Sequence, residues 1–465
     1  MSLAVDELTG KSVTALAAMI RARKVSPVEV VAAHLRRIEE LNPLLNAVVT
    51  LAPDALERAR AAEAVLMRGG VTGALHGVPL TIKDTIDTQG LRTTCGSRAL
   101  AGHVPLVDAP AVARLKAAGA IVLGKTNTAE LALTYEASNP VFGRTNNPLD
   151  ARLTAGGSSG GEAAAISCGL SPAGLGSDLM GSIRVPAHFC GVVGLKPTTG
   201  RVPCAGHTPD ATGPLALGAV LGPLARRVED LSLLLRVLGG FNAAESVSVP
   251  VARAEGAGAE LRGCRVAWYG FDGVTPVRAE ILEALQAAAR ALEDAGLLVE
   301  ERRPPGVEVG PSLWTRLFAR AALACLRRVY KGQEQLAGED ARFLLERIEE
   351  APPSADDFVA AWNERDRLRA ELIEWMLDAP LIIAPVGAVG AFEHGARKVS
   401  VGSERLSIFR AFSYSQTYNV FGLPVVCVPA GRAANGLPVG VQIIARPFAE
   451  ETALAAAAIV EAAQS

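Results

Sequence analysis

Two glycine-rich segments place serine hydroxyls in loops that also expose backbone N–H groups. In TAGGSSGGEAAAISCG, at 154–169, Ser158 and Ser159 lie between two pairs of glycines and precede a run typical of a helix. Glycine is conformationally costly, so its density here indicates a chain that turns sharply or approaches a ligand closely. In GLGSDLMGSIRVPAHFCGVVGLKPTTG, at 174–200, Ser182 lies in a second segment suited to presenting successive amides. A serine hydroxyl becomes a strong nucleophile when a base removes its proton.

A lysine lies where a strand is expected to end. The segment HGVPLTIKDTID, at 76–87, is a short β-branched run closed by charged residues, which predicts a buried strand with Lys83 at its end. A buried lysine loses part of its affinity for the proton because desolvation disfavours the ammonium. A fall of about 3 units from 10.4 corresponds to roughly 4 kcal/mol, and buried lysines show shifts of this size.

Three sequence blocks carry a family resemblance. GVPLTIKD, AGGSSGGEAAA and GSDLMGSIRVPAHFCGVVGLKPT resemble the three blocks of the amidase signature family. Ser158 and Ser182 are 24 positions apart (182 minus 158), which is the separation of that family's two catalytic serines. The likeness is dense from 70 to 240 and returns at NVFGLPVVCVPAG and GLPVGVQIIARP, whereas 263–418 resembles the family only loosely.

The resemblance implies a serine amidohydrolase with a catalytic triad. It makes Ser182 the nucleophile, Ser158 the bridging serine at the family's cis-peptide position, and Lys83 the base. Ser158 can accept and donate a hydrogen bond at once, so it can relay a proton between Ser182 and Lys83 and later to the leaving amine. The resemblance implies no cofactor and no metal.

The tetrahedral oxyanion of acyl transfer needs preorganised donors. The resemblance assigns them to the backbone N–H groups of Leu179, Met180, Gly181 and Ser182. Most members have glycine where Met180 stands, and a methionine keeps its N–H in place only if its φ is negative. This position therefore bears on the geometry of the oxyanion hole and on acyl-side specificity.

Three further residues are predicted to support the site. Ser159 precedes a helix, where serine commonly acts as the N-cap. Asp178 and Arg184 flank Ser182, and we expect them to pair and brace its loop rather than to take part directly in catalysis.

Other catalytic arrangements fit the sequence less well. GGSSG matches the G-x-S-x-G pattern of a nucleophile elbow, which would make Ser158 the nucleophile of a Ser-His-Asp α/β-hydrolase. That arrangement needs a strand running directly into the serine, and the preceding TNNPLDARLTAG is typical of a loop. His188 lies just past Ser182, while His207 and His394 lie in poorly defined segments. The six histidines show no metal-ligand spacing.

The elements around these segments alternate between strands and helices. Ser26 to Glu29 form a capping box with Pro27 at the first helical position. Hydrophobic spacing predicts helices near 27–41, 53–67, 109–118, 281–296 and 449–463. Buried runs predict strands near 120–127, 264–270, 297–304, 380–387, 423–431 and 438–447. The stretch 312–378 is predicted to be helical, with Trp314, Phe318 and Trp375 in its helix core rather than in a substrate pocket.

This pattern favours a single α/β domain over 1–465: a large mixed β-sheet sandwiched by α-helices, with a helical lid. Its expected parts are N-terminal helices at 1–68, a core at 70–240, an exposed linker at 241–262, and a C-terminal α/β half at 263–465 with the lid at 305–378.

Composition narrows the classes of partner. A formal net charge of -2 gives no basic footprint for nucleic acid. The seven scattered cysteines form no C-x-x-C pair and are expected to be reduced and mostly buried. The N-terminus lacks the pattern of a secretory signal, and apolar stretches such as 213–225 and 379–391 are too short to span a bilayer, so we expect a cytoplasmic protein without a membrane span.

The expected function is hydrolysis of a small-molecule amide through an acyl-enzyme, extending to aryl amides, carbamates or urethanes, and esters. Relatives of the same family include fatty acid amide hydrolase, aryl acylamidases, urethanases and the glutaminase components of glutamyl-tRNA amidotransferases. The alternative is therefore a glutaminase component that hands ammonia to a partner within a complex. A homodimer is also compatible with the sequence.

Overall fold

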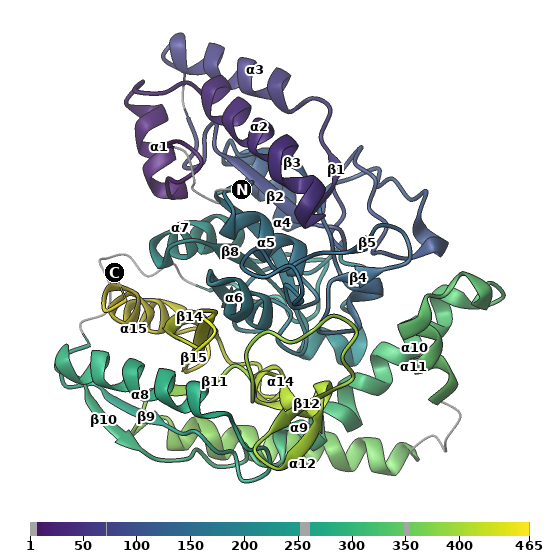
Figure 1. Ribbon diagram of the computed structural model, residues 1–465, viewed down its shortest axis with the longest axis vertical. Helices are drawn as coiled ribbons and strands as arrows, with labels where there is room; N and C mark the ends of the chain where they lie inside the picture. The colour runs from purple at the N-terminus through teal and green to yellow at the C-terminus, as the bar shows by residue number, and fades with distance from the viewer. Residues whose placement is uncertain (1–6, 71, 252–260, 348–353, 465) are drawn as a thin grey trace.

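An eleven-stranded sheet runs through the whole molecule (Figure 1). The computed structural model describes residues 7–70, 72–251, 261–347 and 354–464. The strand order is β1-β3-β2-β6-β8-β7-β14-β15-β11-β9-β10. In chain order the strands are β1 Val48–Leu51, β2 Pro79–Lys83, β3 Ile121–Thr126, β6 Ala173–Asp178, β7 Val193–Lys196, β8 Val220–Ala225, β9 Arg265–Trp268, β10 Leu298–Glu301, β11 Leu381–Pro385, β14 Val425–Arg432 and β15 Pro438–Ala445.

The sheet is mixed, as predicted. β2 is parallel to both β3 and β6, and β9 is parallel to both β10 and β11, while the other pairs are antiparallel. Strands from the C-terminal half continue the N-terminal sheet without a break, because β7 pairs with β14. Two hairpins lie outside it: β4 Ser138–Asn139 with β5 Gly143–Arg144, and β12 Lys398–Val401 with β13 Glu404–Ser407.

Helices flank the sheet along its length (Figure 1). Helices α5 and α6 pack against each other, and α4, α7, α15 and α8 form a second row in which each contacts the next. The α-helices are α1 Val13–Arg21, α2 Pro27–Leu45, α3 Ala55–Met67, α4 Pro110–Ala117, α5 Gly160–Ser167, α6 Arg184–Cys190, α7 Val228–Leu238, α8 Ala279–Asp294, α9 Gly310–Trp314, α10 Arg320–Tyr330, α11 Glu339–Arg347, α12 Ala355–Trp375, α13 Ile408–Ala411, α14 Ser413–Val420 and α15 Glu450–Ala462.

Local sequence signals place several of these elements. Helix α2 begins with the predicted capping box, in which the Ser26 hydroxyl accepts from the Glu29 N–H and the Glu29 carboxylate accepts from the Ser26 N–H. Such a cap is worth about 1 kcal/mol because it satisfies N–H groups that the helix itself leaves unpaired. Strand β2 ends at Lys83, and all five of its residues are buried.

The helical stretch after β10 is less regular than predicted. Helices α9 and α10 are joined through a π-helical segment at Thr315–Ala319, and a short 3-10 turn at Glu334–Leu336 separates α10 from α11. Helices α10 and α11 project at one side of the molecule, and α12 runs along its end near α9 (Figure 1). The expected linker at 241–262 lies partly outside the described residues, and its described parts, 241–251 and 261–262, form no helix or strand.

Glycine is needed where the loop around Ser158 lies against the 127–136 region. A Cβ at Gly161, in the first turn of α5, would lie 2.4 Å from the backbone nitrogen of Asn127. One at Gly157 would lie 2.5 Å from the backbone nitrogen of Glu136. Real side chains do not fit at these distances from backbone, so the glycines around Ser158 allow α5 and its leading loop to lie against the 127–136 region.

All seven cysteines are free thiols, five of them buried. Among the described residues, no helix combines the length and apolar content that crossing a bilayer requires.

Candidate active site

Lys83 and Ser158 meet inside the molecule. The Lys83 side chain is fully buried, and its Nζ lies 2.6 Å from Oγ of Ser158. The same nitrogen lies 2.9 Å from Oγ of Ser177. Ser158 follows a cis peptide bond from Gly157 and lies in the loop that leads into α5.

The sheet explains this meeting. Strands β2 and β6 are parallel neighbours, with Thr81 opposite Gly174 and Ile82 opposite Leu175. The carboxyl ends of parallel strands lie at the same edge of a sheet, where α/β proteins commonly bind ligands. Lys83, the last residue of β2, is therefore brought beside Ser177, the penultimate residue of β6.

Burial changes the chemistry of this amine. It lowers the pKa of Lys83 from 10.5 to about 7, although the nearby carboxylate of Asp178 acts in the opposite direction. The cause is the cost of holding an ammonium away from water. A substantial fraction of the amine is then neutral near pH 7, and a neutral amine can accept a proton from a hydroxyl group.

Ser182 lies in the turn between β6 and α6 and is only 3% exposed. It lines a narrow cavity of about 60 Å³ together with Ser158, Ser177 and His207. The Ser182 carbonyl accepts a hydrogen bond of 3.1 Å from the N–H of Ser159. Within the described residues its hydroxyl makes no hydrogen bond, so the structure brings Ser182 to the same cavity as Ser158 without joining the two hydroxyls directly.

Two side chains from distant parts of the chain hold the loop before Ser182 by donating hydrogen bonds to its backbone carbonyl groups. The indole Nε1 of Trp314 donates to the Leu179 carbonyl at 2.8 Å, and the hydroxyl of Tyr135 donates to the Met180 carbonyl at 2.7 Å. Both donors come from distant parts of the chain, and Tyr135 in turn accepts from Nε2 of Gln416 at 3.1 Å.

The four predicted oxyanion donors are not equivalent. The Gly181 N–H donates to Oδ1 of Asp178 at 2.8 Å and is therefore already engaged. For Leu179, Met180 and Ser182, no acceptor of the backbone N–H lies among the described residues. In this part of the chain, three of the four predicted groups are thus available to bind an oxyanion.

Met180 occurs where the backbone does not need glycine. Gly181 has a φ of +112°, and a Cβ there would lie 2.6 Å from Cβ of Ser415. Met180 does not have a positive φ, and its side chain is only 3% exposed. The methionine therefore packs into the core while its backbone keeps an ordinary conformation.

A buried ion pair holds the turn, as predicted. Arg184 and Asp178 are both inaccessible to solvent and lie 2.7 Å apart. Arg184 also donates to Oδ1 of Asn419 at 2.6 Å and to Oε1 of Gln442 at 2.5 Å. Burial alone would raise the pKa of Asp178, but the charge and hydrogen bonds of Arg184 hold it well below its usual range. The resulting stability is present above the unfolded-state pKa near 4 and is lost as the pH falls toward the folded-state pKa.

Ser159 and Glu162 lie at the start of α5, and the Ser159 hydroxyl does not make the capping bond that was expected. Ser159 occupies the N-cap position, but its hydroxyl makes no capping bond and donates to the Ser177 carbonyl at 3.4 Å. Glu162 lies in the first turn and is fully buried, where it accepts hydrogen bonds from the hydroxyls of Thr81 and Thr126. Burial raises the pKa of Glu162 to about 7, although these hydrogen bonds act in the opposite direction.

A second cavity, of about 480 Å³, adjoins the first. The two share Leu133 and Ala322 in their walls. Most of the larger wall is hydrophobic, and among the described residues that form it only Arg410 has a formal charge. Its hydrophobic lining residues are Leu133, Val274, Pro311, Trp314, Ala319, Ala322, Leu323, Leu344 and Phe409.

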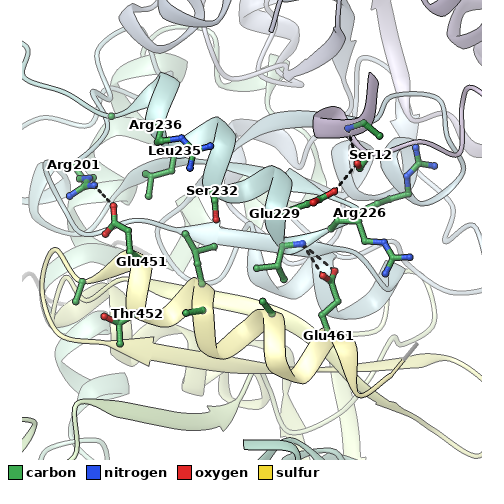
Figure 2. Close-up of a pocket in the computed structure, with 18 of the residues that line it drawn as sticks. Ser12, Arg201, Arg226, Glu229, Ser232, Leu235, Arg236, Glu451, Thr452 and Glu461 are labelled. Atoms are coloured by element: carbon green, nitrogen blue, oxygen red, sulfur yellow. Dashed lines mark hydrogen bonds and ion pairs between the residues drawn. The ribbon is translucent and has the colours of Figure 1, made fainter. Parts of the chain in front are cut away.

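A larger cavity, of about 1220 Å³, lies elsewhere, between α7 and α15 (Figure 2). None of the predicted site residues lines it. Two contacts of its charged side chains are visible in the close-up: Arg201 pairs with Glu451 at 2.9 Å, and Glu461 accepts from the N–H of Val228 at 3.1 Å (Figure 2). The Ser12 hydroxyl donates to the Glu229 carboxylate at 2.8 Å in this cavity, but neither residue lies in the three sequence blocks that carry the family resemblance.

Comparison with known proteins decides the family. The model of the Amidase family matches residues 29–454. The chain belongs to the amidase signature family. It is 33% identical to an acylamidase of Rhodococcus erythropolis over 97% of this chain and 95% of that protein. It is also 33% identical to the GatA-type component of the glutamyl-tRNA(Gln) amidotransferase of Carboxydothermus hydrogenoformans over 94% and 93% of the two chains.

Solved structures agree with this family. A bacterial aryl acylamidase of the amidase signature enzymes superposes with a TM-score of 0.87 at 29% identity, covering 97% of this chain and 96% of that one. This amidase is accordingly a hydrolase of carbon–nitrogen bonds other than peptide bonds. Relatives that act on free amides and relatives that are amidotransferase components are equally similar to it.

The amidase does not have the arrangement of a Ser-His-Asp α/β-hydrolase. No strand leads directly into Ser158, because the described residues just before it form a loop. The imidazole of His188 contacts the Val389 carbonyl and accepts from the Gly440 N–H, and that of His394 contacts Glu136. His207 contacts Ser177 rather than either candidate serine.

Sequence reasoning missed four residues of this site. Ser177 and His207 extend the hydrogen bonds of Lys83, and neither lies in a pattern that marks it as functional. No sequence motif or spacing marked Tyr135 as part of the site. Trp314 was expected in the helix core; it is buried, yet it also lines the 480 Å³ cavity and holds the Leu179 carbonyl.

Replacing Arg184 with methionine should lower the free energy of unfolding by about 3–5 kcal/mol, because Asp178 would remain buried without its cation. Denaturant unfolding of both proteins measures the difference. The matched control is Arg316→Met, whose ion pair with Glu364 has side chains 38% and 35% exposed and should contribute about 1 kcal/mol at most. Equal losses in the two variants would contradict the bracing role of Arg184.

Proposed function

We propose that this amidase hydrolyses small amides bearing an aryl or alkyl group, through an acyl-enzyme on Ser182. The observation that carries the proposal is the fully buried Lys83 amine, 2.6 Å from the Ser158 hydroxyl in the wall of the cavity that Ser182 also lines. A base with a pKa near 7, a hydroxyl in contact with it and a second hydroxyl in the same cavity are the parts that serine-based acyl transfer needs.

The proposed reaction has two halves. Neutral Lys83 takes the proton of Ser158 as Ser158 takes that of Ser182, and Oγ of Ser182 attacks the substrate carbonyl carbon. The N–H groups of Leu179, Met180 and Ser182 bind the resulting oxyanion. The proton then returns through Ser158 to the leaving nitrogen, and the carbon–nitrogen bond breaks. Water repeats the sequence on the ester, which releases the acid and restores Ser182.

The adjoining 480 Å³ cavity supports the substrate class. It opens beside the 60 Å³ cavity at Leu133 and Ala322, so a group attached to the reacting amide can extend into it. Mostly hydrophobic walls favour an aryl or alkyl group, because burial of apolar surface contributes about 25 cal/mol per Å². Carbamates and esters present the same carbonyl and belong in the proposed range.

The alternative, a glutaminase component of an amidotransferase, is favoured by the similarity to proteins of that kind. Glutamine would bring an α-ammonium and an α-carboxylate into the site. Among the described residues in the walls of these two cavities, Asp178 is the only carboxylate, and it is already paired with Arg184. Arg410, a cation in the wall of the larger cavity, is likewise paired with Glu404 at 3.2 Å. The cavity walls therefore suit an apolar group better than an amino acid.

The nucleophile is tested with Ser182→Ala. A panel of anilides, aliphatic amides, carbamates, esters and glutamine is assayed with the wild type and the variant. We expect the wild type to prefer anilides over glutamine, and Ser182→Ala to lower kcat/KM by about 10⁴-fold or more. Ser167→Ala, at the end of α5 and outside both cavities, is the control. Turnover retained by Ser182→Ala would remove the nucleophile assignment, and a preference for glutamine would favour the amidotransferase alternative.

The substrate cavity is tested at Ala322, which lies at its junction with the smaller cavity. Ala322→Phe should lower kcat/KM for anilides by about tenfold or more and leave acetamide within about twofold, because only the larger group needs the junction. Ala324→Phe places the same side chain at an exposed position of α10 and should have little effect. Equal losses for both substrates would show that the group binds elsewhere.

The base is tested by the pH dependence of kcat/KM. Only neutral Lys83 accepts a proton, and its pKa is about 7. The rate should therefore rise about tenfold per pH unit below pH 7 and level off above it. Lys83→Ala should lose this dependence, with a residual rate that keeps rising at high pH. A profile that is flat from pH 5.5 to 8.5 in the wild type would exclude Lys83 as the base.

A further inference from the structure

The direction of the hydrogen bonds at Lys83 decides whether it can act as a base. A neutral amine has two N–H groups and one lone pair. Its nitrogen has two hydroxyl neighbours, Ser158 at 2.6 Å and Ser177 at 2.9 Å. Each hydroxyl can donate or accept. Only an arrangement in which the lone pair faces Ser158 allows the proton to leave Ser182 in the direction of Lys83.

A histidine on the far side of Ser177 has a fixed tautomer. Nδ1 of His207 lies 2.9 Å from the carbonyl oxygen of Pro209, and a carbonyl only accepts, so Nδ1 carries the ring proton. Burial, followed by the charge of Lys83, lowers the pKa of His207 to about 4, so the ring is neutral near pH 7. Nε2 is then a pure acceptor, and it lies 2.9 Å from Oγ of Ser177.

This acceptor determines the role of Ser177. The single hydroxyl proton of Ser177 is given to Nε2 of His207, so its oxygen can only accept from Lys83. One N–H of Lys83 is thereby directed to Ser177, and the lone pair is left for Ser158. We propose that His207, acting through Ser177, is a positioning residue that aims the lone pair of Lys83 at Ser158; this inference rests on the proposed role of Lys83 as the base.

The fold holds His207 in this place. Its backbone forms an antiparallel bridge with Ile86, three residues after Lys83, and its N–H donates to the Cys204 carbonyl at 3.2 Å. The next N–H, of Thr208, donates to the Thr85 carbonyl at 2.8 Å. The loop that carries His207 is therefore attached to the segment that follows β2.

The charges around this series are few. Lys83 is the titratable group that acts on His207, and the carboxyl groups of Asp178 and Glu162 and the buried thiol of Cys95 are those that act on Lys83. Without the imidazole, the Ser177 hydroxyl is free to donate to the lone pair of Lys83 and to compete with Ser158. The expected defect is thus a lower rate on the alkaline plateau, where Lys83 is neutral, and not a loss of folding.

The tautomer is measured directly in the wild type, without reference to activity. The protein has six histidines, so a sample labelled with ¹⁵N in the imidazole ring gives a small set of signals, and His207→Gln assigns those of His207. We expect a protonated Nδ1 and an unprotonated Nε2 from pH 6 to 8. A ring protonated at Nε2, or at both nitrogens, over this range would overturn the proposal.

The consequence is measured with a double-mutant cycle. His207→Leu should lower the plateau kcat/KM by about tenfold or more, while His207→Gln, whose amide oxygen can accept from Ser177, should stay within about threefold. Adding Ser177→Ala to His207→Leu should cause no further loss, because it removes the competing donor. Melting temperatures identify any variant that is merely unfolded.

Two results would overturn the positioning role: wild-type rates in His207→Leu, or multiplicative losses in the double variant with no rescue by His207→Gln. Failure of the proposed function has a different signature. There Ser182→Ala would keep its turnover while the ring signals of His207 stay as expected.

Discussion

The site depends on an amine kept away from water at the carboxyl end of a parallel strand. In water a lysine keeps its proton up to about pH 10, so near pH 7 it has no lone pair with which to accept a proton from a hydroxyl group. At the end of β2, with every residue of the strand buried, the pKa of Lys83 falls to about 7. The sheet and the helices that flank it provide this environment. Loss of packing around β2 would return the amine to water and raise its pKa, so that near pH 7 it would be protonated and unable to accept a proton.

The turn that carries Ser182 depends on a different kind of constraint. Its carbonyls are held by Trp314 and Tyr135, and the carboxylate of Asp178 takes up the Gly181 N–H. Arg184 then connects that carboxylate to α14 and β15. Donors fixed before the substrate arrives need no reorganisation during the reaction, which is the main source of oxyanion stabilisation in enzymes. The fixed geometry of this turn therefore suits the proposed binding of an oxyanion.

Sequence patterns predicted most of the elements but fewer of the contacts. Strand β2, the capping box of α2 and the pairing of Asp178 with Arg184 each follow from neighbouring residues, and all three are present. The mixed sheet was also predicted, together with the family. The residues that sequence reasoning missed act over long distances in the chain: His207 reaches Ser177 from 30 positions away, and Trp314 reaches Leu179 from 135.

Such long-range partners leave no local signal. A tryptophan in a helical stretch has the same hydrophobic spacing whether its indole N–H faces a carbonyl or a cavity, so Trp314 was placed in the core alone. The Gly181 N–H was counted among the oxyanion donors, although Asp178, three residues earlier, occupies it. Hydrogen-bond direction is a property of the assembled site, and single residues do not encode it.

The order of synthesis gives the placement of Arg184 a further meaning. Lys83, Ser158 and Ser182 are all made within the first half of the chain, and the ribosome has released them long before Asn419 and Gln442 exist. Yet Arg184 takes its outer partners from those two late residues, and β7 takes its neighbour from β14. A nascent chain thus carries the three proposed catalytic groups before their surroundings exist, and the sheet is complete only when β14 and β15 are translated.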